Sequence, residues 1–228
     1  MLLLILGALL AILIYIPSYW VRRVMAQHDQ DIAGLPGTGG ELAEHLIKRF
    51  QLDGIGVEEG KPMQDHFDPN AGVVRLSPDN YNGRSLTAIA IAAHEVGHAM
   101  QFHRKEKIFE LRKRYLPLAN RLSRIGVAIM WAFPIIGFML RSPGIVGVII
   151  GTSLLLQLAG ALAYLIILPE EWDASFNKAL PVLIEGNYIE KEQIPAARKI
   201  LKAAALTYFA AALASVINIG RWFMILRR

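Results

Sequence analysis

The chain has 228 residues, of which 54% are hydrophobic and 19% are charged, and its net charge is +5. A soluble domain usually has about 25% charged residues, so the composition argues against an ordinary soluble domain. The chain has no cysteine, which excludes a disulfide scaffold, a thiolate metal site and a cysteine nucleophile. All 19 acidic residues lie in two windows, 29–110 and 170–192, and the rest of the chain is mostly apolar.

Apolar segments outside these windows predict about four transmembrane helices, each of which needs roughly 20 apolar residues. The first is residues 1–20, a hairpin of two helices covers residues 117–168 with a turn near 141–144, and the last is residues 203–220. The first segment lacks the basic start and the cleavage site of a signal peptide, so we interpret it as a retained anchor. The last segment is short, so it either crosses the membrane completely or inserts only part of the way.

Basic residues flank these segments and predict their orientation. Two arginines follow the first segment, a basic run at residues 104–124 leads into the hairpin, and two lysines precede the last segment. If four helices span, all three clusters lie on one side, which the positive-inside rule makes the cytoplasm. The basic tail at residues 221–228 opposes this weakly. We therefore expect a multi-pass protein of a bacterial plasma membrane that contacts lipid, and no binding of nucleic acid.

Two segments, residues 21–116 and 169–202, contain charges of both signs and are expected to form one small α+β region at the cytoplasmic face. A capping-box pattern at Thr38 predicts the start of a helix. Short strands are expected around Val57 and at residues 73–76, followed by an apolar helix from Ser85 to about residue 103. The predicted fold class is therefore mainly α, with membrane helices and a small α+β region.

The apolar helix carries the sequence His94-Glu95-Val96-Gly97-His98. Histidines four residues apart lie on one face of a helix, so both rings can bind one zinc ion. Glu95 is displaced around the helix, where it can contact the metal-bound water as the general base of a hydrolysis. Gly97 leaves out a side chain close to the metal. A chance match is the alternative, but two imidazoles on an apolar helix need partners.

A catalytic zinc ion needs a third protein ligand and one open position for water. Without cysteine, that ligand must be a histidine or a carboxylate, and His103 lies on the wrong face of the helix. The second acidic window supplies the candidates, which are Glu170, Glu171 and Asp173. A membrane adaptor with a structural zinc site is the alternative function. Such a site gains nothing from Glu95, so we favour a hydrolase.

Several stretches, in this order, resemble the YugP-type family of membrane-embedded neutral zinc metallopeptidases. They are Asp65–Pro69, Val73–Ser77, Ser85–Gln101, Leu168–Ser175 and Ala204–Tyr208. The resemblance covers nearly the whole chain and implies a zincin-like membrane endopeptidase with one zinc ion per chain. It is distantly similar to the HtpX-type quality-control proteases, so membrane-associated or misfolded polypeptides are the implied substrates.

In that looser group the third ligand belongs to a Glu-x-x-Ala-Asp motif. Carried over in register, the motif makes Glu171 the third zinc ligand, as in gluzincins, and Ala174 matches. Ser175 stands where the motif has its aspartate. The carboxylate that usually orients a ligand histidine is therefore missing at this position. Glu170 remains the alternative ligand, and only in that case could Asp173 substitute for the missing carboxylate.

Three further groups have both a functional and a structural interpretation. One predicted strand either binds an extended substrate by edge addition or is purely structural; its residues are Val73, Val74, Arg75 and Leu76. Tyr208 either donates a hydrogen bond to the oxyanion of the hydrolysis or packs within its helix. An acidic cluster either forms a second metal site or stabilises a turn; its residues are Asp65, His66 and Asp68.

Overall fold

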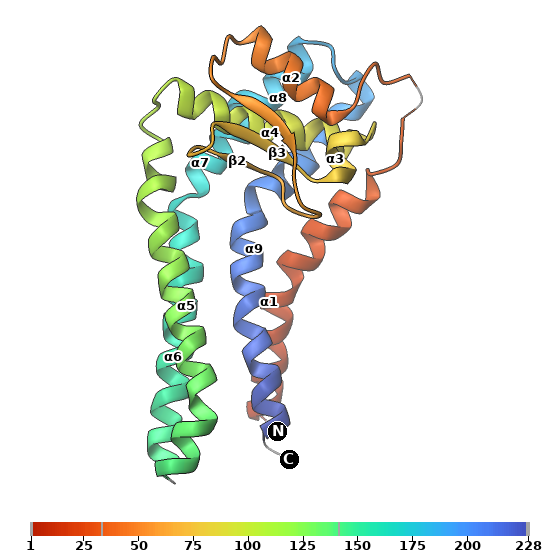
Figure 1. Cartoon of the computed structure of the whole chain (residues 1–228). Helices are drawn as coiled ribbons and strands as arrows, with labels where there is room; N and C mark the ends of the chain where they lie inside the picture. The colour runs from red at the N-terminus through yellow and green to blue at the C-terminus, as the bar shows by residue number, and fades with distance from the viewer. Residues whose placement is uncertain (1, 33, 141, 227–228) are drawn as a thin grey trace. The chain divides into compact units, whose positions relative to one another are not determined.

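The computed structural model describes residues 2–32, 34–140 and 142–226. The chain divides into two compact units. One, which we call the helical unit, comprises residues 1–19, 111–167 and 207–228. The other, which we call the mixed unit, comprises residues 20–110 and 168–206. Figure 1 shows the helices and strands along the chain.

The helical unit contains long helices, which are α1 (Leu2–Gln27), α5 (Phe109–Leu140), α6 (Pro143–Ala163) and α9 (Ile194–Leu226). Three of them, α1, α5 and α9, continue into the mixed unit. Close backbone approach holds α5 against α6, since a Cβ atom on Gly126 would lie 2.8 Å from the carbonyl oxygen of Ser153. The hydroxyl of Ser153 donates a hydrogen bond to the carbonyl of Gly126 at 2.7 Å. Small residues thus let the two helices pack with their backbones close together.

One helix in the described part of the chain is long and apolar enough to cross a membrane, Gly144–Ile166. The prediction of about four such helices is therefore wrong for the residues that the structure describes. In α5, basic residues extend as far as Arg124, so the uncharged stretch that follows is shorter than a membrane span. The predicted first and last spans lie partly outside the residues whose side chains are described.

The mixed unit begins with a capped helix and a three-stranded sheet. The capping box predicted at Thr38 is confirmed, because Thr38 and Glu41 exchange hydrogen bonds at the start of α2 (Gly39–Arg49). The strands are β1 (Gly56–Glu59), β2 (His66–Asp68) and β3 (Val73–Leu76). The sheet order is β1-β3-β2, with β3 parallel to β1 and antiparallel to β2.

This sheet order corrects one prediction. β3 is the central strand: β1 pairs with all four of its residues, and β2 pairs with Val73, Val74 and Arg75. A substrate strand therefore has no free edge at Val73, Val74 or Arg75, and the predicted edge addition is wrong at these residues; for Leu76 it stays a prediction. The free edges of the sheet belong to β1 and β2.

The remaining elements surround one buried helix. α4 (Leu86–His103) follows the short helix α3 (Pro78–Asn82) and is buried from Leu86 to Gln101. It packs against α2, the strands β2 and β3, and a π-helical segment formed by residues 173–179. That segment continues directly from α7 (Leu168–Trp172) and leads into α8 (Leu180–Glu185). The second stretch of the mixed unit thus lies directly on the helix that carries the two predicted histidine ligands.

Candidate metal centre

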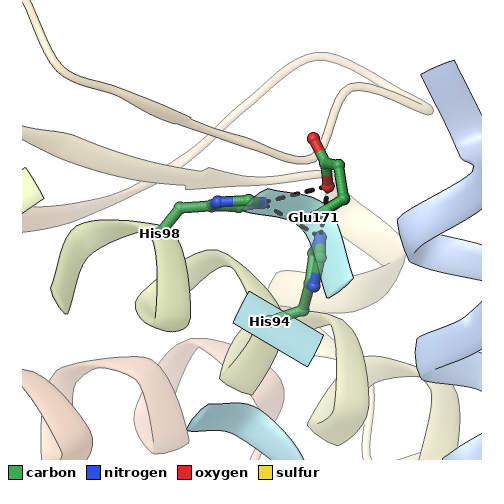
Figure 2. Close-up of side chains that lie close together, drawn as sticks. All are labelled: His94, His98 and Glu171. Atoms are coloured by element: carbon green, nitrogen blue, oxygen red, sulfur yellow. Dashed lines mark hydrogen bonds and ion pairs between the residues drawn. The ribbon is translucent and has the colours of Figure 1, made fainter. Parts of the chain in front are cut away.

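Three side chains from two elements of the mixed unit meet at one point (Figure 2). His94 and His98 come from adjacent turns of α4, and Glu171 comes from α7. The Nε2 atoms of the two histidines are 3.2 Å apart, and Oε2 of Glu171 lies 3.2 Å from Nε2 of His98 and 3.4 Å from Nε2 of His94. All three residues are buried, with at most 3% of their surface exposed.

The size of this triangle fits a zinc ion. Tetrahedral coordination with bonds of roughly 2.0–2.1 Å places the ligand atoms about 3.3–3.4 Å from one another. The observed separations of 3.2–3.4 Å agree with that spacing. The donor set also fits, because two imidazole nitrogens and one carboxylate oxygen are common zinc ligands. Among the described residues, this cluster is formed by His94, His98 and Glu171 and does not include Glu95.

Hydrogen bonds behind His98 fix its tautomer. Its Nδ1 atom lies 2.7 Å from Oε1 of Glu170 and 3.1 Å from Oε1 of Gln101. The amide nitrogen of Gln101 is already directed to the carbonyl of Glu170 and the carboxylate of Asp173, so its oxygen must face the ring. An amide oxygen can only accept hydrogen bonds. Nδ1 therefore carries the proton, and Nε2 offers its lone pair to a metal.

His94 is held in the same tautomer by a different group. Its Nδ1 atom lies 3.0 Å from the hydroxyl oxygen of Ser175, which is also 3.1 Å from the carbonyl oxygen of Leu201. A carbonyl can only accept, so the hydroxyl donates its single proton to Leu201 and accepts from the ring. Nε2 of His94 is therefore also free to bind a metal.

The general-base candidate is held by the sheet. Glu95 is 7% exposed, and its Oε2 atom accepts a hydrogen bond of 2.9 Å from the backbone N–H of Phe67 in β2. This bond fixes the carboxylate at β2, one of the two edge strands of the sheet. The sequence pattern predicted a role for Glu95 but contained no signal for its contact with Phe67.

Gly97 has a different role from the predicted one. A Cβ atom at this position would lie 2.7 Å from the carbonyl oxygen of Ala174, in the π-helical segment. The missing side chain therefore makes room for the neighbouring backbone rather than for the metal. This close approach brings Ser175 within reach of His94 and keeps Glu171 next to the histidines.

A chain of polar contacts extends from the site to the end of α4. Asp173 accepts hydrogen bonds from Gln101, Asn177 and Lys178, and Lys178 also bonds Glu106 at 2.8 Å. Burial raises the pKa of Asp173, but these hydrogen bonds outweigh that effect and the net pKa is lowered. Asp173 is thus an anionic anchor for Gln101 rather than a metal ligand.

The other predicted site residues lie elsewhere. Asp65 accepts hydrogen bonds from the N–H and hydroxyl of Ser77 and from Asn80, at the start of α3. Asp68 bonds the turn that follows it and the Arg75 guanidinium. These contacts match the turn interpretation of the acidic cluster rather than a second metal site.

Tyr208 belongs to the helical unit. Its ring stacks on Tyr164 at 6.1 Å, and its hydroxyl lies 3.4 Å from a guanidinium nitrogen of Arg112. The predicted role of Tyr208 at the oxyanion stays a prediction.

The site contains residues that the sequence analysis did not identify. Gln101 and Ser175 act on the two histidines through hydrogen bonds that no spacing rule predicts. The one available signal was the departure of Ser175 from the aspartate of the motif.

Comparison with known proteins gives two matches. The sequence matches a family model described as "Putative neutral zinc metallopeptidase" over residues 2–227. A curated relative is the "Putative membrane protease YugP" of Bacillus subtilis (strain 168), which is 33% identical over 213 residues. The aligned region covers 91% of this chain and 91% of the relative. No solved structure gives a significant match.

Proposed function

The chain belongs to the "Putative neutral zinc metallopeptidase" family, and we propose that it is a zinc endopeptidase that hydrolyses peptide bonds of membrane-associated or misfolded polypeptides. The observation that carries the proposal is the buried triangle of His94, His98 and Glu171, whose atoms have the spacing of zinc ligands. A gluzincin-like site with one zinc ion per chain follows from this donor set.

The chain's own residues supply the rest of the hydrolysis. When bound, zinc makes a water more acidic and polarises the substrate carbonyl. Glu95 takes the proton of the attacking water and passes it to the departing amine. The N–H of Phe67 holds this carboxylate in place, so Glu95 needs no rearrangement before it accepts the proton.

An extended substrate has to use a strand other than β3. β2 has a free edge, and its residue Phe67 contacts Glu95. We propose that an extended substrate lies along this edge, which would carry its peptide bond past the general base. Tyr208 as a donor to the oxyanion is a further element of the proposal, and Tyr208→Phe is the variant that examines it.

We also propose that the protein acts at a membrane. The relative's name contains "membrane protease", and α6 with its following turn supplies the apolar helix Gly144–Ile166. In the sequence, basic residues adjoin the apolar segments; they are Arg22 and Arg23, the basic run at residues 104–124, and Lys199 and Lys202. By the positive-inside rule they favour the cytoplasmic face for the metal centre. Polypeptide and lipid are then the expected partners.

The decisive test replaces Glu95 with glutamine in the full chain. A glutamine oxygen can still accept the hydrogen bond from Phe67, so the fold and the zinc content should stay near wild type. Loss of the general base should lower the rate of cleavage of an unfolded test polypeptide by about 10²–10⁴-fold. Zinc content is measured by atomic absorption and cleavage by the release of labelled fragments.

The matched control is Glu44→Gln, which removes an exposed carboxylate of α2. It should cleave at the wild-type rate. If Glu95→Gln cleaves as fast as wild type, the adaptor with a structural zinc site becomes the better account. If Glu95→Gln instead loses its zinc, Glu95 is a ligand and the proposed division of roles fails.

A further inference from the structure

The third-ligand motif of this chain lacks a charge that such motifs normally provide. Metal-binding histidines usually donate their second N–H to a carboxylate or a carbonyl, which fixes the ring and makes it a stronger ligand. Position 175, where the motif has aspartate, holds Ser175, and its neutral hydroxyl bonds His94. The ring of His94 is therefore held, but by an uncharged group.

A carboxylate is nevertheless present, behind the other histidine. Oε1 of Glu170 lies 2.7 Å from Nδ1 of His98, and the residue is 0% exposed. We propose that Glu170 is a positioning residue that has taken over the role of the orienting carboxylate, acting on His98 instead of His94. This inference rests on the proposed zinc site.

The packing of the π-helical segment explains why the carboxylate is not at position 175. A Cβ atom on Gly97 would lie only 2.7 Å from the carbonyl of Ala174, so this segment lies directly on α4. Ser175 is 0% exposed and already reaches both His94 and the carbonyl of Leu201. An aspartate would extend one bond further into this space and would bring a negative oxygen against that carbonyl. A hydroxyl, which can donate, suits the position.

The geometry also separates the two glutamates. Glu170 contacts Nδ1 of His98, whereas Glu171 lies 3.2 Å from Nε2 of the same ring. The two nitrogens of an imidazole point in different directions. Glu170 therefore lies behind the ring when Nε2 faces the ion, which makes it the orienting group and Glu171 the ligand.

Gln101 ties this arrangement to α4. Its amide nitrogen donates to the backbone carbonyl of Glu170 at 3.0 Å, and its oxygen lies 3.1 Å from Nδ1 of His98. Asp173 holds the same amide at 2.9 Å. The chain is thus connected to the histidine-bearing helix on both sides of Glu171, from α7 and from the π-helical segment, and the carboxylate of Glu170 has little freedom to leave the ring.

The test measures zinc affinity in the full chain by competition with a chromogenic chelator. Glu170→Gln keeps the size of the side chain and an acceptor oxygen but removes the charge. We expect it to bind zinc about 10–100-fold more weakly than wild type, the usual cost of losing such a partner. Ser175→Ala should cost less, because it removes a neutral group. The control, Glu185→Gln, changes an exposed residue of α8 and should bind as wild type does.

A second readout separates an orienting residue from a ligand. In protein loaded with cobalt instead of zinc, the visible absorption bands report the ligand set. Glu170→Gln should keep the bands of wild type, whereas Glu171→Gln should change them. If Glu170→Gln alters the bands as Glu171→Gln does, Glu170 is a ligand and the inference is wrong.

The remaining outcomes are also decisive. Unchanged zinc affinity in Glu170→Gln, or a larger loss in Ser175→Ala than in Glu170→Gln, would overturn the inference and leave the proposed function intact. Failure of the wild-type chain to bind zinc would overturn the proposed function itself. If Glu170→Gln does not fold, Glu170→Asp replaces it; this variant draws the carboxylate back from the ring by one methylene and should bind zinc more weakly than wild type, and unchanged affinity would overturn the inference.

Discussion

At the scale of single residues, neighbours that can only accept or only donate hydrogen bonds determine the chemistry of this site. The two histidines carry their protons on Nδ1 because acceptors lie behind both rings. The same rule applies to Asp68, outside the site, whose carboxylate faces only donors. It accepts from the backbone N–H groups of Asn70 and Ala71 and from Arg75.

The charge of Asp68 should make stability depend on pH. The hydrogen bond from Arg75 is the main cause of a lowered pKa of Asp68, and the two backbone bonds add to it. Because the folded pKa lies below the unfolded value of about 3.9, the charged form stabilises the fold above that pH, and this gain disappears as the pH falls through the folded pKa.

The variant Asp68→Asn keeps an acceptor for the backbone N–H groups and removes the charge. Its urea midpoint at pH 7, followed by near-UV circular dichroism, should be lower than that of wild type. The difference between the two should shrink below about pH 4, the unfolded value. Both proteins are measured with chelator, so that loss of metal in acid does not contribute. A difference that is constant with pH would contradict the prediction.

The residues of the site differ in how far the sequence could predict them. His94, Glu95 and His98 follow from their spacing on one helix, and the resemblance to a family pointed to Glu171. The contacts of Glu170, Gln101 and Ser175 with the rings were not predictable, because they depend on how closely one backbone approaches another.

At the scale of elements, the junction between α4 and the π-helical segment is the critical contact. π-helical turns are rare and often occur at functional sites. Here the segment at residues 173–179 carries Ser175 and follows directly after α7, the helix that contains Glu171. The sequence predicted α4 and the central strand β3, but it did not predict the position of β3 in the sheet. Pairing across the sheet is decided by contacts that are distant in the chain.

A methyl group at Gly97 should separate the two elements. Gly97→Ala places an atom about 2.7 Å from the carbonyl of Ala174, so the segment must move away from α4. Overpacking of this kind typically costs about 1–3 kcal/mol, against a gain of about 1 kcal/mol in helix propensity. We expect weaker zinc binding together with a lower free energy of unfolding, measured by chelator competition and by denaturant titration.

Gly151→Ala in α6 is the matched control, because nothing lies within 4 Å of a Cβ atom there. It should leave zinc affinity unchanged and should not lower stability. Wild-type zinc affinity in Gly97→Ala would show that the close approach does not position the ligands.

At the scale of the whole molecule, an apolar side chain that is exposed in the structure can face either lipid or water. Leu155 in α6 and Met63 in the mixed unit are both strongly exposed, at 68% and 81%. Leu155 lies near the middle of the apolar helix Gly144–Ile166, where lipid would cover it. Met63 should instead face water.

The absence of cysteine makes this difference measurable. In membranes that contain the single variants, Met63→Cys should react with a membrane-impermeant maleimide, and Leu155→Cys should react only after the membrane is dissolved and the protein is denatured. The added mass of the label, read by mass spectrometry, reports the reaction. Equal labelling of both positions in intact membranes would contradict a lipid-covered α6. In whole cells, protection of Met63→Cys would place the mixed unit on the cytoplasmic side.

The two stretches of the mixed unit also set the time at which the proposed zinc site can become complete. Glu171 follows His98 by 73 residues, and the helices of the hairpin lie between them in the chain. At about 5–20 residues per second, a ribosome needs about 4–15 s to make that distance. During this interval the growing chain has both histidines but lacks Glu171, the proposed third ligand. Until Glu171 has been made, a growing chain lacks one of the three proposed zinc ligands, so under the proposed function it cannot cut the other nascent chains around it.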